Sequence, residues 1–126
     1  MKNNFPTAMP TPSTLRYSPI APERRALDAT PGALLLQFGV DWCGHCQAAE
    51  PAIVQALQAF PELAHLCIED GAGRALGRSF KVKLWPTLVL LQDGQEVARL
   101  VRPTQLQEVQ KLLVPLGTGI AGQTIG

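Results

Sequence analysis

The sequence predicts an α/β domain with a mixed central sheet of four or five strands and helices on both faces. Two observations support this prediction. Two nearly continuous apolar runs, at 33–40 and 63–68, are separated by a long helical pattern at 46–60, which is typical of parallel strands joined by a helical crossover. A hairpin pattern further along then adds antiparallel neighbours to the same sheet.

The hairpin lies at 87–101. Segments with strand character at 87–91 and 96–101 flank Asp93-Gly94, a dipeptide that favours the tight turn between two antiparallel strands. A fifth, short edge strand is expected at 14–18, where Leu15 and Tyr17 alternate with polar residues.

Helices are expected between and after these strands. Pro51 lies inside the long helix, where it removes a backbone donor, so a kink is predicted about one turn after Cys46. Thr104 and Gln107 form a capping-box pattern at the start of the last helix. The helices are expected at 22–29, 46–60, 71–82 and from 104 to about 115–117.

The chain length and charge limit the classes of protein to consider. With 126 residues, one domain at 14–117 is expected, with a flexible proline-rich extension at 1–13 and a flexible tail at 118–126. Lys and Arg number 11 against 10 Asp and Glu, so we expect neither nucleic acid nor membrane as a partner. The longest apolar runs are strand-sized.

The cysteine count points to a compartment. The three cysteines, Cys43, Cys46 and Cys67, are too few for a structural disulfide framework, and their odd number leaves one of them without a partner in any set of internal disulfides. The first residues lack the continuous apolar region of a signal peptide. We therefore expect a cytoplasmic protein with one cycling pair, and Cys67 as a small buried hydrophobic residue.

The segment Trp42-Cys43-Gly44-His45-Cys46 carries the predicted chemistry. It follows the central strand, which puts Cys43 at the start of the long helix, where free backbone donors and the macrodipole favour a thiolate. Cys46 lies one turn deeper, suited to resolving a mixed disulfide after Cys43 has attacked. A zinc site is disfavoured because no second close pair of ligands accompanies this one.

Three motifs together resemble the thioredoxin superfamily. They are Trp42-Cys43-Gly44-His45-Cys46, Pro51 in the following helix, and Trp85-Pro86-Thr87 about forty residues on. The resemblance covers roughly 15–116 and implies a thiol:disulfide oxidoreductase that needs neither cofactor nor metal. It also implies protein disulfides as substrates, a monomer, and an electron donor of the thioredoxin-reductase type or glutathione.

The resemblance assigns further residues to the site. It implies a cis peptide bond between Trp85 and Pro86 beside the thiols, with Trp85, Thr87 and Arg102 along the substrate groove. The residues that it implies as support for the two cysteines are Trp42, which lies in an apolar rim, Gly44, His45 and Pro86. A partly protonated His45 would stabilise the reduced state and make the disulfide a better oxidant.

Two positions depart from the family pattern. Gln37 stands where thioredoxins usually carry a buried acid that moves the proton of the resolving cysteine, so resolution would be slower or rely on water, Glu69 or His45. Arg102 stands where a glycine is typical, and it either selects partners by charge and bulk or points away into solvent. For Asp41 and His65 we expect surface roles.

Two other functions stay open. The first is a disulfide isomerase or oxidant tuned by His45. The second is a non-catalytic, chaperone-like binding module on the same fold, with the prolines of the extension docking a partner.

Overall fold

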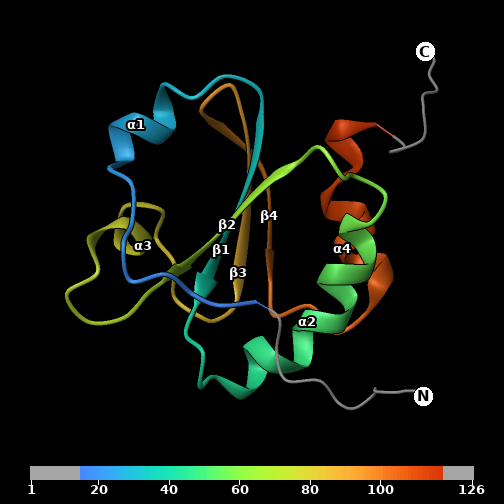
Figure 1. Cartoon of the computed structure of the whole chain (residues 1–126), viewed down its shortest axis with the longest axis horizontal. Helices are drawn as coiled ribbons and strands as arrows, with labels where there is room; N and C mark the ends of the chain where they lie inside the picture. The colour runs from blue at the N-terminus through green and yellow to red at the C-terminus, as the bar shows by residue number, and fades with distance from the viewer. Residues whose placement is uncertain (1–14, 118–126) are drawn as a thin grey trace, which may run out of the picture.

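A computed structural model of the chain describes residues 15–117. Its sheet has the strand order β2-β1-β3-β4, with β1 parallel to β2 and antiparallel to β3, and β3 antiparallel to β4 (Figure 1). The predicted mixed α/β sheet is confirmed with four strands. These are β1 (Ala33–Gly39), β2 (Ala64–Glu69), β3 (Thr87–Gln92) and β4 (Gln95–Val101).

The strand expected at 14–18 is replaced by a single bridge. Ser18 pairs with Ile68 beside β2, and its backbone bonds to Cys67 and Glu69, whereas residue 14 lies outside the described residues. The next backbone donor on the side of β2, that of Ile20, bonds to the Ser18 hydroxyl at 3.1 Å instead of to β2, so the ladder does not continue. The segment thus crosses the end of β2 without becoming a strand.

The predicted hairpin is confirmed. Asp93 and Gly94 both have positive φ, at 52° and 82°, as a tight type I′ turn requires. The Asp93 carboxylate also accepts a hydrogen bond from the Gly32 backbone at 2.8 Å, which ties the turn to the loop before β1.

The helices are α1 (Arg24–Asp28), α2 (Gly44–Leu57), α3 (Ala75–Ser79) and α4 (Leu106–Leu112), followed by a 3-10 turn at Val114–Leu116. The expected range 71–82 shortens to α3 because Gly71 and Gly73 have positive φ, outside helical geometry. Within residues 15–117, no helix combines the length and the apolar character needed to cross a membrane.

The capping box of the last helix lies one residue later than predicted. Gln105 is the N-cap of α4, and the Glu108 carboxylate accepts hydrogen bonds from the backbone of Thr104 and Gln105 at 2.8 and 2.9 Å. An acid at this place satisfies free donors of the helix start and complements its macrodipole. The pairing of Thr104 with Gln107 was therefore wrong.

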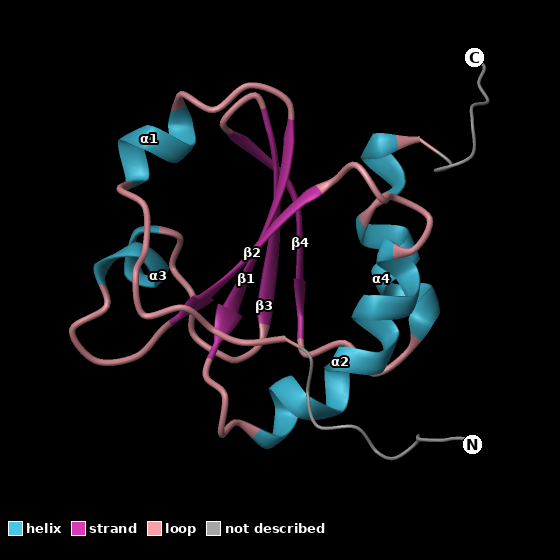
Figure 2. Cartoon of the chain, in the orientation of Figure 1, coloured by secondary structure: helices cyan, strands magenta, loops and turns pink. Residues whose placement is uncertain are grey.

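Helices cover both faces of the sheet, as predicted (Figure 2). Leu35, Leu88 and Leu90 pack with α2 and α4 on one face, whereas Leu34, Leu36, Phe38, Val89 and Leu91 pack with α1 and α3 on the other. This alternation follows from the two-residue period of strands. It places Gln37 and Gly39, which share the parity of Leu35, on the face of α2.

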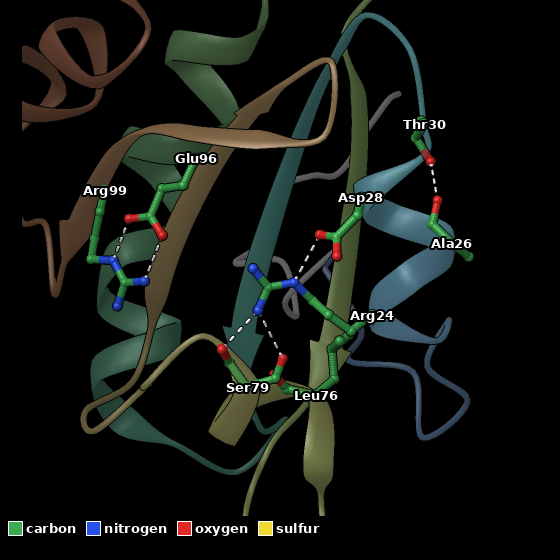
Figure 3. A network of polar contacts seen from close by, with 8 residues as sticks. All are labelled: Arg24, Ala26, Asp28, Thr30, Leu76, Ser79, Glu96 and Arg99. Atoms are coloured by element: carbon green, nitrogen blue, oxygen red, sulfur yellow. Dashed lines mark hydrogen bonds and ion pairs between the residues drawn. The ribbon is translucent and has the colours of Figure 1, made fainter.

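Polar contacts fix α1 against the neighbouring elements (Figure 3). The Arg24 guanidinium donates to the Ser79 carbonyl at 2.7 Å, pairs with Asp28 at 3.0 Å and lies 3.8 Å from the centre of the Phe80 ring. On β4, Arg99 pairs with Glu96 at 2.7 Å. These contacts lie at the opposite side of the sheet from α2.

Candidate active site

Cys43 is the N-cap residue of α2. It follows the loop after β1 in extended geometry, with φ −81° and ψ 121°, and its Sγ accepts the backbone N–H of Cys46 at 3.3 Å. The helix therefore begins at Gly44, two residues earlier than expected, because the sulfur takes the place of a capping oxygen. The first turn thus points the backbone N–H of Cys46 at this sulfur, the arrangement that binds anions at helix starts.

Pro51 lies in the interior of α2. The helix continues through it, and Figure 1 shows that α2 changes direction between its first turns and its later ones. A proline lacks the N–H of the helical ladder and crowds the preceding turn, which accounts for such a bend. The bend separates the turn that carries the cysteines from the part of the helix that packs on α4.

Cys46 is held below Cys43 in an apolar setting. Only 4% of its surface is exposed, and it clusters with Tyr17, Val40 and Cys43. Burial is the main cause that raises the pKa of its thiol to about 11, while hydrogen bonds from the Val40 backbone and the Tyr17 side chain act in the opposite direction. Cys46 is thus a buried thiol at neutral pH.

We call Trp42, Trp85 and Arg102 the rim of the site. Trp42 is 76% exposed, and its ring and the Trp85 ring make a T-shaped contact at a centroid distance of 5.9 Å. Trp85 packs against the cysteine cluster and donates from its indole nitrogen to Asp70 at 2.8 Å. Apolar surface therefore lies directly beside the two sulfurs.

The Trp85-Pro86 peptide bond is cis, as the resemblance implied. Arg102 has a positive φ of 52°, its N–H donates to the Pro86 carbonyl, and its Nε donates to the Trp85 carbonyl at 2.8 Å. The side chain therefore lies across this loop and does not point away into solvent. Thr87 is buried, and its hydroxyl donates to the Leu84 carbonyl at 2.6 Å, so that side chain holds the turn.

We call Tyr17, Gln37 and His65 the floor of the site. Gln37 is fully buried; its amide donates to the Tyr17 hydroxyl at 2.6 Å, and its Oε1 lies 2.9 Å from His65 Nε2. The expectation of a surface role for His65 was therefore wrong. Burial lowers its pKa, because the charged imidazolium is disfavoured away from water.

Tyr17 is the site residue that sequence reasoning missed. Its alternation with Leu15 indicated only that it faces inward, and nothing local shows that a segment twenty residues before Gln37 returns to the cysteines. The Asp41 carboxylate fixes that segment by accepting the Tyr17 backbone N–H at 2.9 Å. Asp41 thus has a structural role that the sequence did not indicate.

The remaining predicted residues have simpler surroundings. Gly44 and His45 are exposed on the first turn of α2. Cys67 is half-buried, and burial raises the pKa of its thiol to about 12. The Glu69 carboxylate pairs with Arg74 at 2.8 Å. Among residues 15–117, no three His, Cys, Asp or Glu side chains converge on a place where a metal ion could bind.

Comparisons with known proteins agree with this geometry. The family model described as Thioredoxin matches residues 24–114. The solved structure of thioredoxin 2 from Pseudomonas aeruginosa PAO1, in its reduced form, is 52% identical, with a TM-score of 0.74 over 82% of this chain and 95% of that chain.

Two plant relatives are more distant. An H-type thioredoxin of Fagopyrum esculentum is 27% identical over 81 residues, which are 64% of this chain and 70% of the plant protein. Thioredoxin H2-1 of Oryza sativa is 31% identical over 68 residues, 54% of this chain and 49% of the rice protein, so the shared segment spans about half of that relative.

A strand-to-helix pair of cysteines, a cis proline beside it and a family match over most of the chain lead to one conclusion. The chain belongs to the thioredoxin family and is a thioredoxin-type thiol:disulfide oxidoreductase with the active-site pair Cys43 and Cys46.

Proposed function

We propose that Cys43 attacks a disulfide of a partner protein and that Cys46 resolves the resulting mixed disulfide. In the first step the Cys43 thiolate bonds to one partner sulfur, and the other leaves with the bonding electron pair and takes up a proton. In the second step Cys46 bonds to Cys43 and releases the first sulfur. The partner disulfide is reduced by two electrons, and the protein ends as the internal disulfide.

One observation carries this order of events. The Cys43 sulfur caps α2 and receives a backbone N–H, whereas the pKa of the Cys46 thiol is raised to about 11, chiefly by burial. Since a thiolate is the attacking species, the sulfur at the helix start attacks first and the buried one second.

Trapping tests the proposal. Cys46→Ser should hold partner proteins on Cys43 as mixed disulfides that a reductant releases. Cys43→Ser, which keeps Cys46, is the matched control and should trap nothing. Equal trapping by the two variants, or trapping by Cys43→Ser alone, would show that the order is wrong.

A disulfide isomerase or oxidant is the second candidate. His45 is exposed on the first turn of α2, between the two cysteines, where a positive charge stabilises a thiolate and with it the reduced state. A reduction potential near roughly −270 mV, the value of thioredoxin itself, supports the reductase, and one near roughly −180 mV supports the isomerase. In the second case His45→Pro should lower the potential.

A thiol-independent binding module is the third candidate, and the exposed aromatic rim favours it. The double variant Cys43→Ser, Cys46→Ser separates it from the two redox functions. Full loss of activity towards partners eliminates the binding module, and retained activity establishes it.

Arg102 selects partners in this proposal. Its Nε donates to the backbone carbonyl of Trp85, a residue that the family resemblance places along the substrate groove. An incoming chain therefore meets a cationic side chain and finds this acceptor already bonded. Arg102→Gly should widen the range of protein disulfides reduced, and unchanged partner kinetics would remove Arg102 from the specificity.

The proposal extends to partners and compartment. The substrates are protein disulfides, the oxidised pair is reduced again by a thioredoxin-reductase-type enzyme or by glutathione, and the protein acts as a monomer in the cytoplasm. Recycling assays with each donor separate the two sources of electrons, and cell fractionation tests the compartment.

A further inference from the structure

The floor forms one hydrogen-bonded chain across three segments. Gln37 on β1 bonds to Tyr17 before α1 and to His65 on β2, at 2.6 and 2.9 Å. All the polar atoms of the Gln37 side chain are buried with it, where unsatisfied donors and acceptors would be costly. This series of hydrogen bonds ends at the Tyr17 hydroxyl, beside the cysteine pair.

Donor and acceptor are defined in each hydrogen bond of the floor. An amide nitrogen only donates, so the Tyr17 oxygen accepts from Gln37 and its own proton remains available for another acceptor. On the other side, Gln37 Oε1 only accepts, so His65 Nε2 carries the proton. A neutral imidazole suffices for this, in agreement with the lowered pKa of His65. His65 Nε2 also lies 3.6 Å from the Cys67 sulfur.

Gly39 brings the Tyr17 ring and the Cys46 sulfur into the same space. A Cβ atom at this position would lie 2.5 Å from Cys46 Sγ and 2.8 Å from Tyr17 Cζ. The glycine therefore leaves the volume in which the phenol reaches the sulfur. A hydrogen bond from Tyr17 is one of the contacts that lower the pKa of Cys46 against the effect of burial.

We propose that Tyr17 is a further catalytic residue whose hydroxyl donates to the Cys46 sulfur and stabilises its thiolate during resolution, and that Gln37 and His65 are positioning residues that orient this hydroxyl. The inference rests on the proposed roles of the two cysteines. The family usually carries a buried acid at the position of Gln37, and that acid accepts a proton. In this protein the Gln37 amide would instead orient the hydroxyl that donates a hydrogen bond to the Cys46 sulfur.

The step balances without a protein base. The bond between the Cys46 and Cys43 sulfurs forms as the bond between Cys43 and the partner sulfur breaks. The partner sulfur leaves with the electron pair and takes up the proton that Cys46 gives up. Tyr17 keeps its proton throughout, because burial raises its pKa.

The test follows both steps in one reaction, with dithiobis(nitrobenzoate) as the disulfide. Attack by Cys43 releases the first thionitrobenzoate at a rate proportional to reagent, and resolution by Cys46 releases the second at a rate independent of reagent. In Tyr17→Phe the first phase should stay within about twofold, while the second slows about tenfold, the effect of one hydrogen bond to a charged group. Equal slowing of both phases, or of neither, overturns the proposal.

A pH profile separates this role from a structural one. The resolution rate in Tyr17→Phe should reach its plateau about one pH unit higher than in the unaltered protein, since one pH unit corresponds to the same tenfold change. Besides Tyr17, the titratable group that acts on Cys46 is Cys43, and Cys67 acts on Tyr17. Asp41 and Glu50 act on Cys67. A profile that keeps its midpoint contradicts the proposal.

Matched variants complete the design. Ser18→Ala removes a hydroxyl from the same segment, where it bonds only locally to the Ile20 backbone, and should leave both phases unchanged. Gln37→Leu should slow the second phase alone, but should add nothing in a Tyr17→Phe background, because Gln37 acts through Tyr17. Additive effects would refute the positioning role.

Different results would contradict the proposed roles of the two cysteines and the proposed role of Tyr17. If no first-phase mixed disulfide forms on Cys43, the proposed function fails. If the mixed disulfide forms and the rate of its resolution is unchanged by the substitutions of Tyr17 and Gln37, only the present inference fails.

Discussion

The rim and the floor of the active site are built by different means. The rim, with Trp42, Trp85 and Arg102, comes from the loops after β1, before β3 and after β4, and it is exposed or half-buried. The floor, with Tyr17, Gln37 and His65, is assembled from three separate segments and is closed by hydrogen bonds. We propose that the rim meets partners, whereas the floor sets the chemistry of the second sulfur.

The largest effect is expected in the floor, from Gly39→Ala. Because the new Cβ would lie 2.5 Å from the Cys46 sulfur and 2.8 Å from the Tyr17 ring, we expect a loss of about 3 kcal/mol in the free energy of unfolding. Denaturant unfolding of the reduced protein measures it. Gly44→Ala is the control, since nothing lies within 4 Å of its Cβ position, and a comparable loss there would contradict the steric argument.

A pH effect comes next and also belongs to the floor. The thiol pKa values of Cys46 and Cys67 are raised to about 11 and about 12, above the ordinary value of a cysteine. Their contribution to stability is therefore fully present below the ordinary pKa of a cysteine and is lost as pH rises from there towards these raised values. Between pH 8 and pH 10 the reduced protein should lose about 1 to 2 kcal/mol, after allowance for solvent screening.

Urea unfolding at the two pH values measures this loss. The variant Cys46→Ala, Cys67→Ala serves as the control, because it lacks both thiols and should show a smaller loss. An equal loss in the variant would mean that other groups cause it.

For the rim, Trp42→Ala should change activity and spare stability. Since the side chain is 76% exposed, the free energy of unfolding should stay within about 0.5 kcal/mol. Removing an aromatic contact for partners should lower kcat/KM for a protein disulfide about tenfold, with little change for a small disulfide. The comparison between rim and floor fails if both substrates are affected alike.

The smallest effect is expected far from both regions. The hydrogen bond from Arg99 lowers the pKa of Glu96, so this pair stabilises the fold above the ordinary pKa of a glutamate, and the stabilisation is lost as pH falls through the lowered value. Glu96→Gln should cost about 0.5 kcal/mol at pH 7, less at pH 3, and leave disulfide reduction unchanged. A loss of activity would show that the site extends to β4.

The sequence was sufficient for most of the fold and for the motifs that carry Trp42 and Trp85, because those features are local, but it left the direction of the Arg102 side chain open. Strand alternation, the Asp93-Gly94 turn and the cysteine motif each depend on a few neighbouring residues. The floor depends on how β1 pairs with β2, where Gln37 stands opposite Cys67, and on the return of the Tyr17 segment to that edge. Neither follows from local patterns, and for that reason His65 and Asp41 looked like surface residues.

The most direct test of the central claim is competitive alkylation of the reduced protein at pH 7, with peptide mapping of the three cysteines. The account predicts that Cys43 is labelled at least about tenfold faster than Cys46 and Cys67, whose thiol pKa values are raised to about 11 and about 12 so that they stay protonated at pH 7. Labelling of Cys46 or Cys67 at the rate of Cys43, or faster, would contradict it.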